Sequence, residues 1–139
     1  MGRYLVVANQ TLGGDPLVSE LRQRIAADAE CSFYVVVPAT HPREHLTWTE
    51  GEAQALAQER LDRALERLRG EGASVDGEVG DENPVQAIDD ALRSGEFQGI
   101  ILSTLPPGTS RWLRQDLPTR VQRRFEIPLT HVIGEADEE

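Results

Sequence analysis

Residues 98–114 read QGIILSTLPPGTSRWLR, and this stretch decides the fold. Its Gly99–Leu102 segment is apolar and holds two β-branched residues, the composition of a central strand that is covered on both faces. The prolines and the glycine at positions 106–108 then enforce a loop, because proline interrupts both helices and strands. Ligands of open parallel sheets bind at the carboxyl ends of the strands, so this loop is the expected functional site. The alternative is an ordinary connection between a strand and a helix.

Five segments have the composition of strands, and helical patterns separate them. The strands are predicted at Leu5–Ala8, Phe33–Val37, Val75–Val79, Gly99–Ser103 and Leu129–Ile133. The third of these alternates polar and apolar residues, which favours an edge position. Strands that alternate with amphipathic helices form parallel sheets covered on both faces, and right-handed crossovers leave few strand orders. The sequence therefore predicts one α/β domain over residues 1–134, a three-layer doubly wound parallel sheet, followed by an acidic tail at 135–139.

Polar residues mark where three of the helices are expected to begin. Asp15 is predicted to cap the first helix, which starts with a proline. Thr49 and Glu52 have the spacing of a capping box at the start of a long helix. Asn83 is predicted to cap a third helix, with the side chain of Gln86 reaching back to the cap.

The segment between the last two strands is rich in arginine. Residues 105–128 hold five arginines against two acidic residues, whereas the whole chain has a formal charge of −10. The plain interpretation is a solvated helix face that balances an acidic body. Pro118 interrupts the apolar pattern here, so either a helix starts only at residue 117 or 118, or a short helix ends near Asp116.

Composition excludes several classes of protein. The charge of −10 argues against nucleic-acid binding, which needs a basic surface. No apolar run approaches the roughly 20 residues that cross a bilayer, and the apolar stretch near the N-terminus is too short for a signal peptide. The single cysteine, Cys31, excludes an internal disulfide. We therefore expect a cytoplasmic protein with no membrane or nucleic-acid partner.

No pattern in the sequence indicates a catalytic or metal centre. His41 and His45 share a loop without a cysteine nearby, so they are interpreted as loop residues rather than metal ligands. Cys31 precedes a strand and has no feature that would lower its pKa. There is no Gly-x-Ser-x-Gly elbow, no nucleophile next to a base and no cluster of histidines and carboxylates. Neither a catalytic residue nor a metal ligand is assigned.

Three segments of the chain resemble the universal stress proteins. They are Leu5–Thr11, residues 75–88, and Gly99–Thr104 followed by a loop, a helix with Arg120-Val121 and then Ile127-Pro128-Leu129. The resemblance extends over almost the whole chain. It implies a five-stranded sheet in the order 3-2-1-4-5, pairing into dimers and a non-enzymatic role in stress survival.

Many members of that family bind ATP through a glycine motif after the fourth strand, and this chain departs from the motif. The first two glycines are replaced by Ser103 and Pro106, and proline has no N–H to donate to a phosphate. The final Gly-Ser pair falls at or beside Asp116, whose carboxylate would repel phosphates. The acidic residue expected after the first strand is Asn9. The resemblance with these departures implies a protein that has lost ATP binding and has no cofactor.

The same region still offers groups that could hold another ligand or anion. Gly108, Thr109, Ser110 and Arg111 could present N–H groups, hydroxyls and a guanidinium, and Trp112 is expected to pack as a core aromatic rather than to cover a ligand. The full set of candidate ligand residues is Asn9, Thr11, Val37, Ser103, Gly108, Thr109, Ser110 and Arg111.

Three functional hypotheses follow. The first is a regulatory dimer of the universal stress type that acts through unidentified protein partners without ATP. The second keeps adenine-nucleotide binding through a rebuilt loop, with Asn9, Val37 and Ser110 near the base and sugar. The third is an enzyme of the wider nucleotide-handling α/β group. The homodimer is expected to use the apolar edge strand Leu129–Ile133, which lacks the lysines that protect exposed edges.

Overall fold

The computed structural model of the chain describes residues 2–9, 11, 12, 14–39, 50–106 and 110–134. Its strands are β1 (Arg3–Val7), β2 (Ser32–Pro38), β3 (Ser74–Gly80), β4 (Gly99–Thr104) and β5 (Leu129–Ile133). Its helices are α1 (Asp15–Ala27), α2 (Glu50–Gly70), α3 (Pro84–Leu92), α4 (Arg111–Arg114) and α5 (Leu117–Arg124). The predicted loop around His41 and His45, the Thr49 cap and the acidic tail lie outside the described residues.

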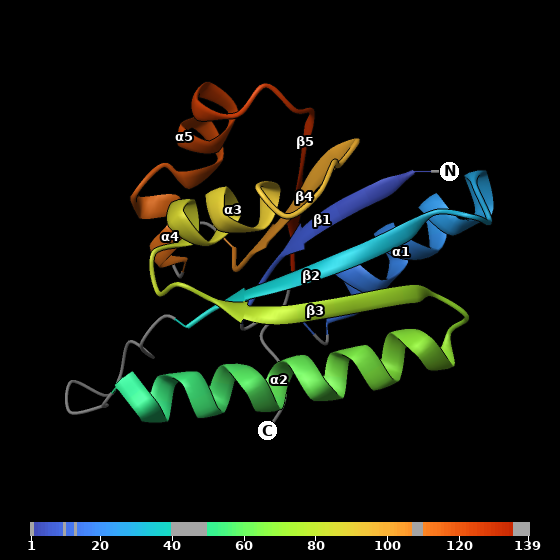
Figure 1. Cartoon of the computed structure of the whole chain (residues 1–139), viewed down its shortest axis with the longest axis horizontal. Helices are drawn as coiled ribbons and strands as arrows, with labels where there is room; N and C mark the ends of the chain where they lie inside the picture. The colour runs from blue at the N-terminus through green and yellow to red at the C-terminus, as the bar shows by residue number, and fades with distance from the viewer. Residues whose placement is uncertain (1, 10, 13, 40–49, 107–109, 135–139) are drawn as a thin grey trace.

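All five strands form one parallel sheet in the order β3-β2-β1-β4-β5 (Figure 1). The predicted strand order is confirmed, and so is the edge position of β3. β4, the strand from which the prediction started, pairs with β1 on one side and with β5 on the other. Every residue of β4 is buried, as expected for an apolar strand with a helical layer on each face.

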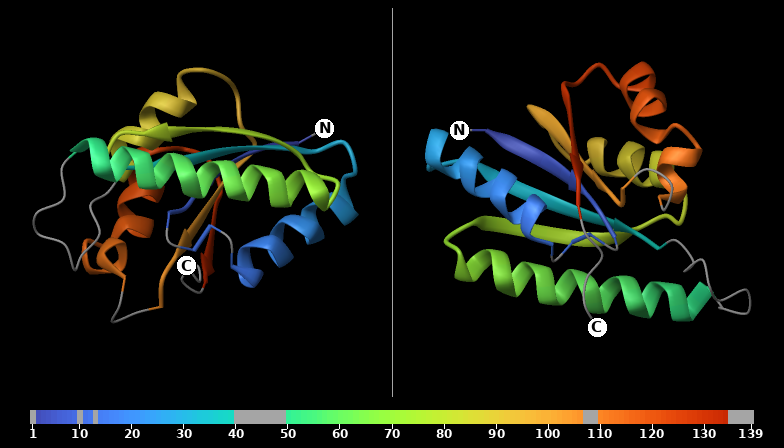
Figure 2. Two further views of the ribbon diagram at one scale, coloured as in Figure 1. Left: turned by 90° about the horizontal axis from the view of Figure 1, so that it is seen from below. Right: turned by 180° about the vertical axis from the view of Figure 1, so that it is seen from behind.

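The helices divide between the two faces of the sheet. Figure 1 shows α2 below the twisted sheet and α3 and α5 above it, and the right-hand view of Figure 2, from behind, shows the same division. One core cluster packs the α1 and α2 side and contains Leu17, Leu21 and Leu61. The other packs the α3 and α5 side around Ile88 and Leu117. The three layers follow from right-handed crossovers, since the connections from β1 to β3 move in one direction across the sheet and those from β3 to β5 move in the other.

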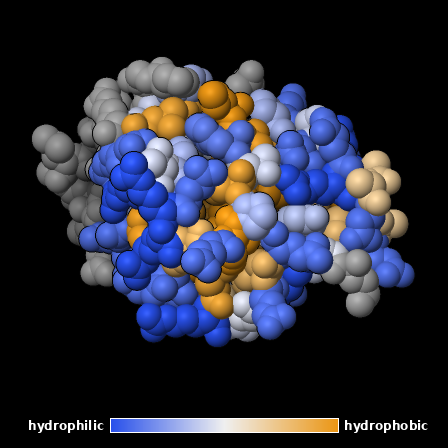
Figure 3. Space-filling view, turned by 90° about the horizontal axis from the view of Figure 1, so that it is seen from above, coloured by the Kyte–Doolittle hydropathy of each residue, from blue (hydrophilic) through white to orange (hydrophobic). Residues whose placement is uncertain are grey.

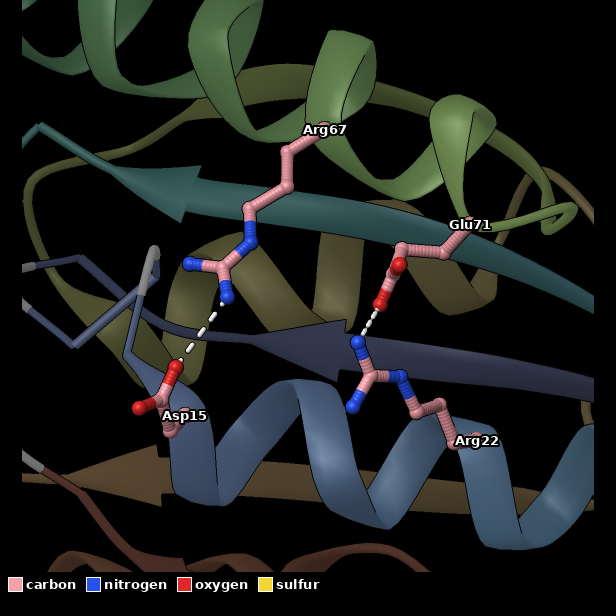
Figure 4. Close-up of polar contacts among 4 residues, drawn as sticks. All are labelled: Asp15, Arg22, Arg67 and Glu71. Atoms are coloured by element: carbon pink, nitrogen blue, oxygen red, sulfur yellow. Dashed lines mark hydrogen bonds and ion pairs between the residues drawn. The ribbon is translucent and has the colours of Figure 1, made fainter.

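Two ion pairs connect α1 to α2 along their exposed sides (Figure 4). Arg67 of α2 contacts Asp15 at 3.1 Å, and Glu71, just beyond α2, pairs with Arg22 of α1. Because these groups face solvent, each pair contributes little, typically below about 1 kcal/mol. The apolar stripes beneath them hold the layer together.

Two predicted helix starts need correction. The cap of α1 is Gly14 rather than Asp15, and Asp15 is instead the first helical residue, where its charge suits the helix dipole. Asn83 does cap α3, accepting from the N–H of Val85. Gln86 does not reach back, because it donates to Asp90 one turn further on.

The arginine-rich segment forms two helices rather than one. α4 ends at Arg114, and α5 begins at Leu117 with Pro118 in its first turn. Asp116 between them adopts the left-handed conformation at φ 56°, which separates the two helix axes. The short-helix alternative is therefore correct, and it leaves Leu117 and Val121 buried against the second core.

Candidate functional site

Polar side chains gather where β1, β2 and β4 end, the edge at which open parallel sheets bind ligands. We define the carboxyl-edge cluster as Asn9, Thr11, Arg60 and Ser103. Ser103 lies on β4, Asn9 and Thr11 lie in the turn that follows β1, and Arg60 comes from the middle of α2. The fold thus brings together three of the predicted residues and adds one that was not predicted.

The carboxamide of Asn9 is hydrogen-bonded at both ends. Its Nδ2 donates to the carbonyl oxygen of Pro38 at 2.7 Å, and its Oδ1 accepts from Nη1 of Arg60 at 2.6 Å. The residue is only 6% exposed. In place of the acidic residue expected from the family resemblance, the chain therefore has an amide that bridges β2 to α2.

Arg60 is the functional candidate that the sequence analysis missed. It follows the buried Ala57 by three residues and precedes the buried Ala64 by four, so it borders the apolar stripe of α2. An arginine beside such a stripe can extend along the protein surface while its guanidinium reaches a polar group. That spacing was the available signal, but only the packing of α2 on the sheet shows which group it reaches.

Thr11 and Ser103 form a second contact within the cluster. Their hydroxyl oxygens lie 2.6 Å apart, and the residues are 2% and 1% exposed. Gly134, directly after β5, packs against them so closely that a Cβ there would lie 3.0 Å from the Cβ of Thr11. Its N–H donates to the carbonyl oxygen of Thr104. Ser103 stands where the resemblance places the first glycine of the family motif. Its hydroxyl is thus enclosed by Thr11, from the turn after β1, and by Gly134, directly after β5.

The remaining predicted residues divide into three cases. Val37 is fully buried in the core of the α2 side and pairs with Val79 of β3. The hydroxyl of Ser110 accepts from the N–H of Leu113 at 3.1 Å and so caps α4. Gly108 and Thr109 lie outside the described residues, as does the side chain of Arg111. Trp112 packs against the second core as expected.

The structure does place a hydroxyl beside an imidazole, contrary to the sequence analysis. Oγ1 of Thr104 lies 2.8 Å from Nε2 of His131, across the pairing of β4 with β5. The same hydroxyl donates to the carbonyl oxygen of Leu105 at 3.0 Å. A hydroxyl that donates to the carbonyl oxygen of Leu105 can accept from Nε2 in the tautomer that has its proton there. This pair is a structural hydrogen bond between neighbouring strands.

The titratable groups with perturbed pKa values do not form a reaction centre. Burial lowers the pKa of His131, which favours its neutral form. Burial, followed by the nearby charge of Asp28, raises the pKa of Cys31, the opposite of an activated thiol. Burial and the hydrogen bond to Glu78 raise the pKa of Tyr34 to about 12. Among the described residues no three potential ligands converge as a metal site would require, and no helix there is long and apolar enough to span a bilayer.

Comparison with known proteins gives matches in structure but not in sequence. No protein-family model matches the chain, and no curated protein sequence matches it. The solved structure of a universal stress protein from Archaeoglobus fulgidus superposes with a TM-score of 0.63 at 18% identity, covering 95% of this chain and 93% of the other.

Two further matches are structures of complexes with nucleotides. The universal stress protein from Archaeoglobus fulgidus in complex with dAMP gives a TM-score of 0.64 at 17% identity, covering 95% of this chain and 97% of the other. A universal stress protein in complex with cAMP gives 0.63 at 16% identity, with coverages of 96% and 98%.

Strand order and helix placement define a doubly wound parallel α/β fold. Within that class, the chain has the universal stress protein fold over nearly its whole length. The fold expected from the three resembling segments is confirmed.

Proposed function

We propose that this chain is a non-enzymatic regulatory protein of the universal stress type that acts through protein contacts and has lost ATP binding. The observation that carries this proposal is that the predicted residues of the carboxyl-edge cluster are buried and already hydrogen-bonded within the protein. Asn9, Thr11 and Ser103 are each buried and hydrogen-bonded to other protein groups. A ligand at this edge would have to break those bonds, and an unpaired buried polar group costs about 1–3 kcal/mol.

The phosphate side of the site supports the same conclusion. Ser103 and Pro106 replace two glycines whose N–H groups would hold phosphates, and proline cannot donate. Asp116 is exposed in its left-handed conformation at the start of α5, where it adds negative charge. Of the two effects, the missing donor is the stronger, because the charge of an exposed carboxylate is screened by solvent.

We predict that the protein binds Mg-ATP no more tightly than the millimolar range, a binding free energy of about −4 kcal/mol. Isothermal titration calorimetry of the pure protein measures this directly. Micromolar binding, or ATP retained through purification, would contradict the proposal. Turnover of a nucleotide would instead favour an enzyme of the wider α/β group.

One observation favours a second candidate, the binding of a nucleoside monophosphate. Two proteins of the same fold form complexes with dAMP and cAMP, and Arg60 places a guanidinium at the carboxyl edge of this sheet. A single phosphate needs fewer N–H donors than a triphosphate, and arginine can bind it in a bidentate manner. The same calorimeter tests this candidate: micromolar binding of dAMP or cAMP that Arg60→Gln abolishes would establish it, and no binding of either nucleotide would leave the first candidate alone.

The edge strand β5 supports a homodimer as part of the proposed function. Ile133 at its end is 49% exposed, which is unusual for a large apolar residue in the described part of the chain, and among the described strands β5 pairs only with β4. Unpaired N–H and C=O groups along such an edge readily pair with a second chain. The other edge strand, β3, carries Asp76 and Glu78 and is protected by their charges.

We predict a homodimer with twice the 15.4 kDa mass of one chain at high micromolar concentration, measured by light scattering. Ile133→Lys should shift the population to monomer, because a lysine at the edge opposes strand pairing. Ser74→Lys, at an exposed position of β3, is the matched control and should leave the mass unchanged. A monomeric wild-type protein, or equal effects of both substitutions, would refute the β5 interface.

A further inference from the structure

Helix α5 is positively charged although the protein as a whole is strongly negative. Its sequence, LPTRVQRR, contains three arginines and no acidic residue, whereas the chain has a formal charge of −10. Arg120, Arg123 and Arg124 are all exposed. Within one short helix they are three and four residues apart, so they lie next to one another on its surface.

Two of the three arginines of α5 differ from most others in their contacts, whereas the third, Arg124, has its Nη2 atom 3.9 Å from Oδ1 of Asp89 in α3. Elsewhere arginines pair with carboxylates of the same chain, namely Arg22 with Glu71, Arg24 with Glu20, Arg67 with Asp15, Arg69 with Asp76, and Arg93 with Asp89. The guanidinium groups of Arg120 and Arg123 have no ion pair, hydrogen bond or ring contact with the rest of the chain that the structure describes. In a chain with 24 acidic residues, that lack of partners is notable.

Helix stability does not account for this arrangement. Arg123 and Arg124 lie in the last turn, where positive charge suits the helix dipole. Arg120 lies in the middle of the helix, and like charges three or four residues apart destabilise a helix by a few tenths of a kcal/mol. The repulsion would be relieved by an acidic group from outside the molecule.

Apolar groups border the charged ones. Phe125 and Ile127 are half-buried directly after α5, and the guanidinium of Arg124 lies 5.6 Å from the ring centre of Phe125. Figure 3 views the molecule from above, the side on which α5 lies in Figure 1, and shows hydrophobic patches divided by strongly hydrophilic side chains. Arginine and aromatic residues together are the composition enriched at protein interfaces.

We propose that the α5 face, defined by Arg120, Arg123, Arg124, Phe125 and Ile127, binds an acidic segment of a partner protein that also carries apolar side chains. The inference gives the partner's chemistry, and it rests on the proposed function for the existence of a protein partner. The choice of an acidic partner rests on charge complementarity with the arginines of the α5 face.

The size of the face selects a protein segment over a nucleic acid or a membrane. Eight helical residues extend about 12 Å. A short acidic segment fits within that length, whereas a duplex or an anionic bilayer would also cover the negatively charged remainder of the surface. At physiological salt the screening length is about 8 Å, so the local charge of α5 governs what binds directly on it.

Fluorescence anisotropy with a labelled peptide tests this inference. The probe is a peptide of about eight residues, about 12 Å long as a helix, in which glutamate and aspartate alternate with leucine and phenylalanine. Binding should weaken with added salt, and Arg120→Glu with Arg123→Glu should weaken it by about tenfold. The control Arg63→Glu with Arg67→Glu makes the same change of charge on exposed positions of α2, across the sheet, and should leave binding nearly unchanged.

The remaining outcomes overturn the inference. They are equal weakening by both double variants, unchanged binding in the α5 variant, and tighter binding of a short DNA duplex or of phosphatidylserine vesicles than of the peptide. A probe with glutamine and asparagine in place of the acids should not bind, and if it does, the charge argument is wrong. ATP titration of the same variants remains a separate readout, so failure of this inference is distinguishable from failure of the proposed function.

Discussion

Replacing Gly77 with alanine is expected to destabilise the protein by about 3 kcal/mol, because the new methyl group has no space. Gly77 lies in β3 opposite Val35 of β2, and α2 packs on the same side. A Cβ at this position would lie 2.5 Å from the carbonyl oxygen of Val35 and 2.8 Å from Cδ1 of Leu61. The nearest atom belongs to the backbone of Val35, a fully buried residue of the interior strand β2, so it cannot move without disturbing the pairing of β2 with β3.

Gly70→Ala is the matched control for this substitution. Gly70 ends α2, and a Cβ there would have no atom within 4 Å. Alanine favours a helix over glycine by up to about 1 kcal/mol, so this variant should be as stable as the wild type or more so. Urea denaturation followed by circular dichroism gives both free energies of unfolding. Equal stabilities of the Gly77 and Gly70 variants would show that β3 can shift to accept the methyl group.

Leu102→Ala is expected to reduce the free energy of unfolding by about 3–4 kcal/mol. Leu102 is fully buried in β4, between β1 and β5, and belongs to the core cluster on the α3 and α5 side. Removing its side chain leaves a cavity between strands that are fixed by pairing on both sides, so the site cannot collapse to fill it. The loss should appear as a lower denaturation midpoint with an unchanged slope.

Leu56→Ala provides the same chemical change at a half-buried position of α2. It removes less apolar contact and improves helix propensity, so its cost should stay below about 1 kcal/mol. A difference of less than about 1 kcal/mol between the two leucine variants would contradict the central place of β4 in the core.

The sequence predicted the sheet because the relevant signals are local. The apolar run Gly99–Leu102 predicted a buried interior strand, and the alternation of polar and apolar residues in β3 predicted an edge strand. The structure has β4 and β3 in these positions. Right-handed crossovers then restrict the strand order. Local signals were less reliable for helix caps: Asn83 caps α3 as predicted, whereas Gln86 bonds Asp90 instead of the cap.

The candidate site could be predicted only in part, since its contacts join distant parts of the chain. The carboxyl ends of β1 and β4 indicated Asn9, Thr11 and Ser103 as site residues. The sequence did not show that the hydroxyls of Thr11 and Ser103, which are 92 residues apart, form a hydrogen bond. The same holds for the hydrogen bond between Thr104 and His131, which depends on the register of β4 with β5.

By itself, then, the sequence determined the strands and the layers, because these depend on residue type and on periodicity along the chain. The strand order and the departures from the glycine motif came from the resemblance to the universal stress proteins. Only the tertiary structure decided that Arg60 reaches Asn9 and that the arginines at positions 120 and 123 remain without acidic partners among the described residues. Such contacts depend on where a long side chain ends after helices and strands have packed, and no periodic pattern encodes that end point.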